Sequence, residues 1–182
     1  MASYQPGDIV MTRSPGLLGK LIRFFTRSVG ERRTKVSHVG VMVNETEIVE
    51  ARRRVVRHPL KETYAGTPTA VAIVRGRDLS APQRRQVAEK ADSYVGRSYG
   101  YAMIVAHALD YFLLGAYVFR RLIRTDKYPI CNWVVAYSYH AIGRDFGVEP
   151  WQTDPDTIWD YTMEWSSKAM FDVVHELGPL ER

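Results

Sequence analysis

The single cysteine, Cys131, is the side chain best suited to nucleophilic chemistry in this sequence. It opens the apolar run from Asn132 to Tyr137, so we predict that it lies in the first turn of a helix. Amide N–H groups and the positive end of the helix dipole stabilise a thiolate there, and they can also hold an oxyanion during acyl transfer. The alternative is that Cys131 is a small buried hydrophobe, which is the usual role of a free cysteine.

A nucleophilic cysteine needs a base. The chain has five histidines, and their positions in the sequence indicate which of them can serve as that base. His140 is excluded because it lies further along the same predicted helix, on the opposite face and roughly 13.5 Å away. His58, beside a proline and arginines, and His175, near the C-terminus, are expected to face solvent. His107 falls in an apolar helical segment, where it is expected to be a core histidine. This leaves His38 as the candidate base.

His38 falls in the segment Val36 to Val43, which is apolar and β-branched enough to predict a buried strand. Side chains alternate between the two faces of a strand, so His38 shares one face with Gly40 and Met42. Gly40 leaves space beside the ring. The only large polar side chain on such a face needs a partner, although a structural histidine remains the alternative.

Glu50 is the expected partner of His38. It ends the apolar run of a second strand, Glu47 to Ala51, which a turn connects to the first strand as a hairpin. His38 and Glu50 are roughly symmetric about this turn, so the two side chains can face each other. A carboxylate there would fix the tautomer of the imidazole and stabilise its charged form. The alternative is an edge-strand glutamate paired with Arg52 or Arg53.

The remaining elements form the frame that must position these residues. Strands come first and helices afterwards, which is the pattern of an α+β domain with helices packed on an antiparallel sheet. No linker or internal repeat divides residues 1–182, so we expect one domain. Further strands are expected over residues 8–11, 54–57 and 70–75, and helices over 17–25, 82–95, 101–114, 118–124, 132–142 and from 154 onwards.

Composition narrows the partners and cofactors. The chain has 182 residues, a formal charge of +5 and a pI near 9.4, an excess that favours an anionic surface such as a membrane or cell wall. Its arginine pairs are too scattered to predict specific nucleic-acid binding. One cysteine excludes a disulfide framework, and no histidine and carboxylate cluster has ligand spacing, so we expect no metal or other cofactor.

Localisation is predicted by the absence of export signals. The N-terminus lacks the basic and apolar regions of a signal peptide, so the default expectation is cytoplasmic, with export by another route left open. Residues 101–119 have the length of a membrane span but carry His107 and Asp110 near the middle, which predicts a core helix. The sequence does not indicate an oligomeric state.

Four short motifs resemble those of a known family. Their order is similar to that in the permuted papain-like group of the NlpC-type cysteine peptidase superfamily, especially its YiiX-like members, and in lecithin retinol acyltransferase-like proteins. The resemblance runs from about residue 7 to residue 155 and rests on Gly7-Asp8-Ile9-Val10, Ser37-His38-Val39-Gly40-Val41, Val49-Glu50-Ala51 and Ile130-Cys131-Asn132-Trp133.

This resemblance implies a circularly permuted papain-like fold, in which the histidine-bearing sheet precedes the cysteine-bearing helix. It implies Cys131 as nucleophile, His38 as base and, less firmly, Glu50 as third residue. The segment ending in Tyr99 is similar to a tyrosine motif of the superfamily, so Tyr99 is expected beside the site, unless it is an ordinary core aromatic.

The expected activity is that of a thiol hydrolase, similar to cysteine peptidases and amidases, or of an acyltransferase. The substrate would be an amide or ester in a peptide, a cell-wall peptide or a lipid acyl group, and nothing in the sequence selects among these. The competing hypothesis is a non-catalytic binding module of the same fold, which holds a lipid, a cell-wall fragment or another acidic ligand.

Overall fold

A computed structural model describes residues 3–16, 20, 34–99, 129–164 and 170–181. The helices expected over residues 17–25, 101–114 and 118–124 lie outside the described residues, as does His107. In chain order the described elements are β1 (Ile9–Arg13), β2 (His38–Met42), β3 (Glu47–Ala51), β4 (Val55–Pro59), α2 (Leu60–Tyr64), β5 (Ala70–Gly76), α3 (Ala81–Asp92), α6 (Cys131–His140), η1 (Pro150–Gln152), α7 (Pro155–Trp159), η2 (Asp160–Glu164) and β6 (Phe171–Pro179).

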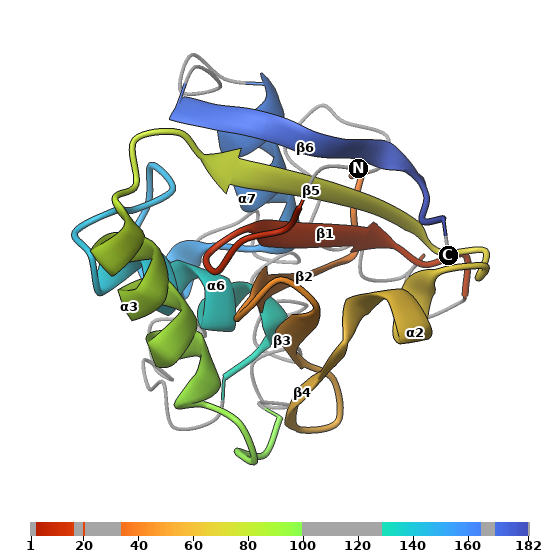
Figure 1. Ribbon diagram of the computed structural model, residues 1–182, viewed down its shortest axis with the longest axis horizontal. Coiled ribbons are helices and arrows are strands. Elements are labelled where there is room, and N and C mark those ends of the chain that lie inside the picture. Colours follow the sequence, from red (N-terminus) through yellow and green to blue (C-terminus); the bar gives the residue numbers. More distant parts are fainter. Residues whose placement is uncertain (1–2, 17–19, 21–33, 100–128, 165–169, 182) are drawn as a thin grey trace, which may run out of the picture.

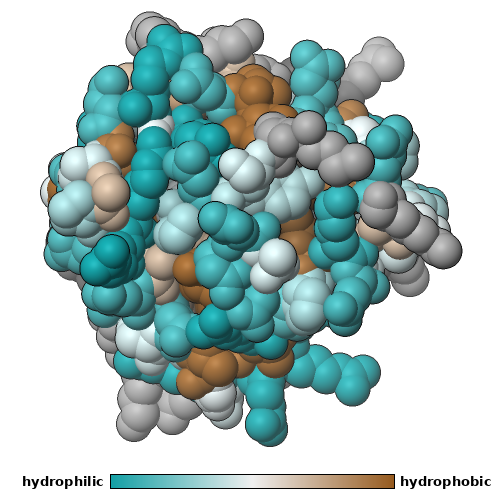
Figure 2. Space-filling model, viewed as in Figure 1, coloured by the Kyte–Doolittle hydropathy of each residue, from teal (hydrophilic) through white to brown (hydrophobic). Residues whose placement is uncertain are grey.

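The strands form one six-stranded sheet in the order β4-β3-β2-β1-β5-β6, and every neighbouring pair is antiparallel. Figure 1 shows this sheet with α3 and α6 at one side and α2 at the other. The predicted α+β class, with helices packed on an antiparallel sheet, is therefore confirmed. Hydrophilic side chains cover most of the face shown in Figure 2, with smaller hydrophobic patches between them.

The two faces of the sheet bury different sets of side chains, as the alternation of residues requires. Val39 and Val41 of β2 point towards α3, α6 and α7 and belong to the larger core. Met42 and Ile48 belong to a smaller core that includes Leu60 and Tyr64 of α2. His38, two positions from Gly40 and four from Met42, starts β2 on the α2 face.

The helix boundaries have local causes. Ser80 accepts a hydrogen bond from the Gln83 amide, and the Gln83 side chain bonds back to the Ser80 backbone, which caps α3. Asp154 caps α7 by accepting from the Thr157 amide, with Pro155 in the first turn. The helix signals read from the sequence at these positions are confirmed. Among the described residues, no helix is both long and apolar enough to span a bilayer.

The C-terminal strand β6 was not predicted from the sequence. It pairs with β5 at the edge of the sheet, with two register shifts along the ladder. His175 lies on this strand opposite Ile73, and its Nε2 is buried. The expectation that His175 faces solvent from a tail is therefore wrong. The short helix α2 was also not predicted, although it supplies Tyr64 to the site described below.

Candidate active site

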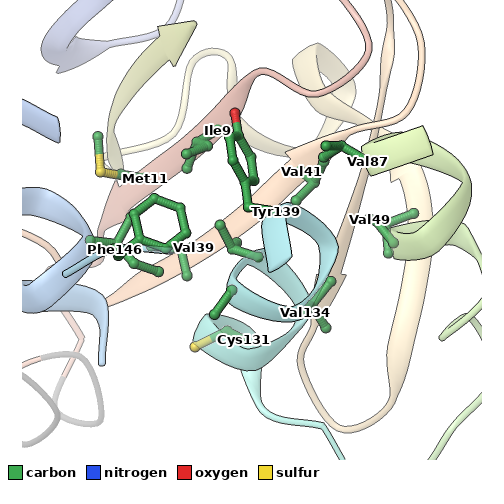
Figure 3. Packing of buried hydrophobic residues seen from close by; sticks show 14 of the residues in the cluster. Ile9, Met11, Val39, Val41, Val49, Val87, Cys131, Val134, Tyr139 and Phe146 are labelled. Atoms are coloured by element: carbon green, nitrogen blue, oxygen red, sulfur yellow. The ribbon is translucent and has the colours of Figure 1, made fainter. Parts of the chain in front are cut away.

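Cys131 is the first residue of α6, as the sequence predicts, and it is 5% exposed. Figure 3 shows it on the first turn of this helix, within the cluster that also contains Val39 and Val134. No side chain among the described residues caps this end of the helix. The Trp133 and Val134 amides donate to the Ile130 carbonyl oxygen, which leaves the amides of Cys131 and Asn132 as the candidate donors near the thiol.

Asn132 fixes the start of α6 and was missed as a site residue. Its side chain is buried, and its Nδ2 donates to the carbonyl oxygen of Thr153 at 2.5 Å. Its Oδ1 lies 3.8 Å from Cys131 Sγ. The hydrogen bond from Asn132 to Thr153 connects the cysteine-bearing turn to the segment that precedes α7. An amide next to the cysteine was the available sequence signal, but its partner lies far away in the chain.

His38, the first residue of β2, interacts with residues on both faces of the sheet. Its Nε2 is 2.9 Å from Glu50 Oε2 on the α2 face, and its ring also interacts with Cys131 of α6. Burial of the ring lowers the pKa of His38, but the negative charges of Cys131 and Glu50 and hydrogen bonds to both raise it to about 10. His38 therefore hydrogen-bonds Glu50 and interacts electrostatically with Cys131.

Glu50 is fully buried, and its carboxylate has four hydrogen-bond donors. Oε2 accepts from His38 and, at 2.6 Å, from the Tyr64 hydroxyl. Oε1 lies 2.5 Å from Arg52 Nε and 2.8 Å from His58 Nε2. Burial raises the pKa of Glu50, but His38, His58 and Arg52 outweigh it and hold the pKa well below its usual value.

The geometry of the hairpin differs from the expectation. Glu50 pairs across the strands with Gly40, so His38 is its diagonal neighbour and does not lie opposite. A Cβ at Gly40 would lie 2.8 Å from Ile48 Cδ1 and 2.9 Å from the Val49 carbonyl oxygen. Only glycine fits there, and the close approach of the strands lets the Glu50 side chain reach His38 along the sheet.

Two other expectations about Glu50 and its neighbours need correction. β3 lies between β2 and β4, so Glu50 is not on an edge strand. Its pairing with Arg52, considered as an alternative to His38, coexists with the His38 contact. His58 was expected to face solvent from a loop, but it lies on β4, is 17% exposed and binds Glu50.

Tyr99 lies close to the cysteine-bearing turn. It is half-buried and packs against the small cluster formed by Ile130 and Trp133, on either side of Cys131 in sequence. Its backbone amide donates to the Arg53 carbonyl at 3.4 Å, which links it to the turn after β3. His140 is exposed at the far end of α6, where its Nδ1 contacts Asp145 at 2.7 Å, as its exclusion predicts.

A separate groove of about 650 Å³ lies between α3 and the N-terminal loop, away from these residues. Its walls carry charges of both signs, including Arg57, Arg84, Glu45 and Asp92. Neither Cys131 nor His38 lines it, so this groove gives no information about the thiol.

Comparison with known proteins supports the fold. No protein-family model and no curated protein matched the sequence. Among solved structures, the chain is similar to the crystal structure of the metalloprotein YiiX, DUF1105, from Escherichia coli O157:H7. The TM-score is 0.58 at 23% identity, over 97% of this chain and 90% of that chain. The expected YiiX-like resemblance is thereby supported at the level of the fold.

That neighbour is described as a metalloprotein. Within the described residues, no group of three or more histidine, cysteine, aspartate and glutamate side chains is arranged to hold a metal ion. Near Cys131, the Nε2 of His38 is engaged by Glu50.

Proposed function

We propose that this chain is a thiol hydrolase or acyltransferase in which Cys131 attacks an amide or ester carbonyl. One observation carries the proposal: His38 hydrogen-bonds a fully buried carboxylate, Glu50, and interacts electrostatically with Cys131. A nucleophile, a base and a group that orients the base are the parts that such chemistry needs. Their order, with the histidine-bearing sheet before the cysteine-bearing helix, is the order expected of a permuted papain-like enzyme.

Glu50 determines which ring nitrogen of His38 acts as the base. An ionised carboxylate only accepts hydrogen bonds, so His38 presents Nε2–H to Glu50. Nδ1 is then the nitrogen left to take the proton of Cys131. The resulting imidazolium is stabilised by Glu50, in agreement with the raised pKa of His38.

The reaction then follows two displacement steps. His38 removes the thiol proton, and the Cys131 sulfur attacks the carbonyl carbon while amides of the first turn of α6 stabilise the oxyanion. His38 returns the proton to the leaving amine or alcohol, and a thioester remains on Cys131. Water or another acceptor, deprotonated by His38, attacks the thioester and releases the acyl group with the thiol restored.

A basic rim at the same end of the sheet favours an anionic substrate or surface. Arg13 ends β1 beside Thr12, which pairs with His38, and Lys35 precedes β2. Arg53 and Arg54 follow β3. All are exposed, and within the described part of the chain they form no ion pair. The rim also suits the alternative function, a binding module for an acidic ligand without turnover.

The first experiment is alkylation of Cys131 by iodoacetamide as a function of pH, followed by intact mass. We expect the wild-type protein to react well below about pH 8, because a neighbouring imidazolium favours a thiolate. His38→Gln keeps a donor for Glu50 but cannot act as a base, so it should react slowly until alkaline pH. His140→Gln is the matched control and should behave as wild type.

Equal and slow alkylation in all three proteins would reject the enzyme and favour the binding module. For substrates, Cys131→Ser and His38→Gln should abolish turnover. Cys131→Ser should change the melting temperature little, whereas His38→Gln also removes the charged partner of Glu50 and should lower it. A large loss of stability, with no turnover in the wild type, would indicate a structural role for the pair.

A further inference from the structure

His58 binds Oε1 of Glu50, the carboxylate oxygen that His38 does not contact. Its partner across the strands, Ile48, belongs to the core on the α2 face, the face that also holds Glu50. The ring is 17% exposed, and Nε2 lies 2.8 Å from Glu50 Oε1. Two histidines therefore contact one carboxylate through opposite oxygens, since His38 contacts Oε2.

The contacts of His58 define where its proton lies. Glu50 is an acceptor, so Nε2 carries the proton, as in His38. Nδ1 lies 2.8 Å from the Thr63 hydroxyl, which also lies 2.9 Å from the Pro59 carbonyl oxygen. In neutral His58 the hydroxyl donates to Nδ1, and in protonated His58 Nδ1–H donates to the hydroxyl, which turns to Pro59. Glu50 keeps its donor in both states.

His58 differs from the other donor on Oε1. The Arg52 side chain is 46% exposed, so solvent screens its charge, although its guanidinium also bonds the Tyr64 hydroxyl at 3.2 Å. His58 is 17% exposed and is held by a strand on one side and by Thr63 of α2 on the other. The histidine is thus the more buried of the two donors that hold Oε1.

We propose that His58 is a positioning residue: by donating to Oε1 it fixes the Glu50 carboxylate so that Oε2 faces His38. This deepens the proposed function, on which its catalytic meaning rests. The charged and titratable groups facing His58 are Glu50 of β3, Arg52 on the same carboxylate, and Tyr64 of α2, whose ring centroid is 6.4 Å from that of His58.

The test is the titration of the His38 ring, followed by NMR of imidazole nitrogens in the full chain. His58→Leu removes the donor, so Glu50 should support the His38 imidazolium less and the His38 midpoint should fall by about one pH unit. His58→Gln places an amide N–H near the position of Nε2 and should retain most of the wild-type midpoint. His140→Leu is the control and should leave it unchanged.

Two results would overturn the proposal: an unchanged His38 midpoint in folded His58→Leu, or an equal fall in His58→Leu and His58→Gln. The second would mean that the ring only fills space. If His58→Leu does not fold, Thr63→Val is used, which removes the partner of Nδ1. The His38 midpoint should then fall by less than one unit, and no fall would contradict the proposal.

This readout needs no substrate and no reactive thiol. The proposed enzyme can therefore fail separately, if His38 titrates as expected while Cys131 remains inert towards iodoacetamide. Where Cys131 does react, its alkylation rate at neutral pH should fall about tenfold in His58→Leu and recover in His58→Gln.

Discussion

Asp8 and Glu50 are both fully buried carboxylates, but one lies just before β1 and the other within β3, and they have different partners. Asp8 precedes β1 and is bound by Arg75 through both of its oxygens, at 2.8 Å and 2.7 Å. The Gln5 amide also donates to it. Glu50 is bound by two histidines, a tyrosine and an arginine.

The difference lies in whether the partners can change their charge. Arginine stays protonated at any ordinary pH, so the Asp8 pair is a fixed ion pair that links the N-terminal loop to β5. Histidine, unlike arginine, can gain and lose its charge, and the pKa of His38 is raised to about 10, so the Glu50 group can respond to protons on the alkaline side. A carboxylate with an arginine on both oxygens serves stability, whereas one shared between histidines also suits proton transfer.

The largest effect is expected from Asp8→Ala. Removing one partner leaves the Arg75 charge, only 19% exposed, without compensation, so the free energy of unfolding should fall by about 3–5 kcal/mol. Denaturant titration measures this loss. Alkylation of Cys131 in the folded variant should not change. The double variant Asp8→Leu, Arg75→Met should regain much of the stability, and a neutral Asp8→Ala would contradict the distinction.

A smaller, pH-dependent effect is expected at Glu50. Its pKa is lowered from 4.5, so its contribution to stability is present above that value and is lost as the pH falls through the lower, folded value. His38 has a pKa raised from 6.5 to about 10, so its contribution is complete below 6.5 and is lost as the pH rises through about 10. These two groups together favour maximal stability between 4.5 and 6.5.

Glu50→Gln should flatten the acidic side of this profile when unfolding free energies are measured across pH. Because each group supports the charge of the other, Glu50→Gln should also lessen the alkaline slope, and His38→Gln should remove the alkaline slope and lessen the acidic one. If both variants keep the wild-type profile, neither group is coupled to folding, and Glu50 would resemble Asp8 after all.

The smallest effect is expected at a third carboxylate, the exposed Asp172. It pairs with Arg77, and both side chains are about half exposed. Exposed ion pairs contribute little, so Arg77→Ala should leave the melting temperature unchanged within error. A clear loss of stability would show that burial does not determine which carboxylates contribute to the stability of the fold.

Sequence alone was sufficient wherever the two faces of an element bury different partners. The alternation in β2 correctly assigned Val39 and Val41 to one face and Met42 to the other, because each face is covered by helices. The helix-start signals at Ser80 and at Asp154-Pro155 likewise correctly predicted where two helices begin.

The sequence was insufficient where a contact depends on register or on an edge. A strand was predicted over residues 54–57, but the edge strand β4 extends to Pro59, so His58 lies on the strand and not in the loop that its place before a proline suggested. Its contact with Glu50 follows only from the pairing of Ile48 with His58. The offset of His38 from Glu50 depends on how tightly the turn closes, which Asn44 determines by accepting from two following amides.

The contact between His38 and Cys131 joins the first half of the chain to the second. Loop closure between such distant segments is entropically costly, so contacts of this kind form late in folding, after the sheet and α6 have associated. A nascent or partly unfolded chain would therefore carry only an ordinary, slow-reacting thiol. The rate at which Cys131 reacts with an alkylating agent would then report when folding is complete.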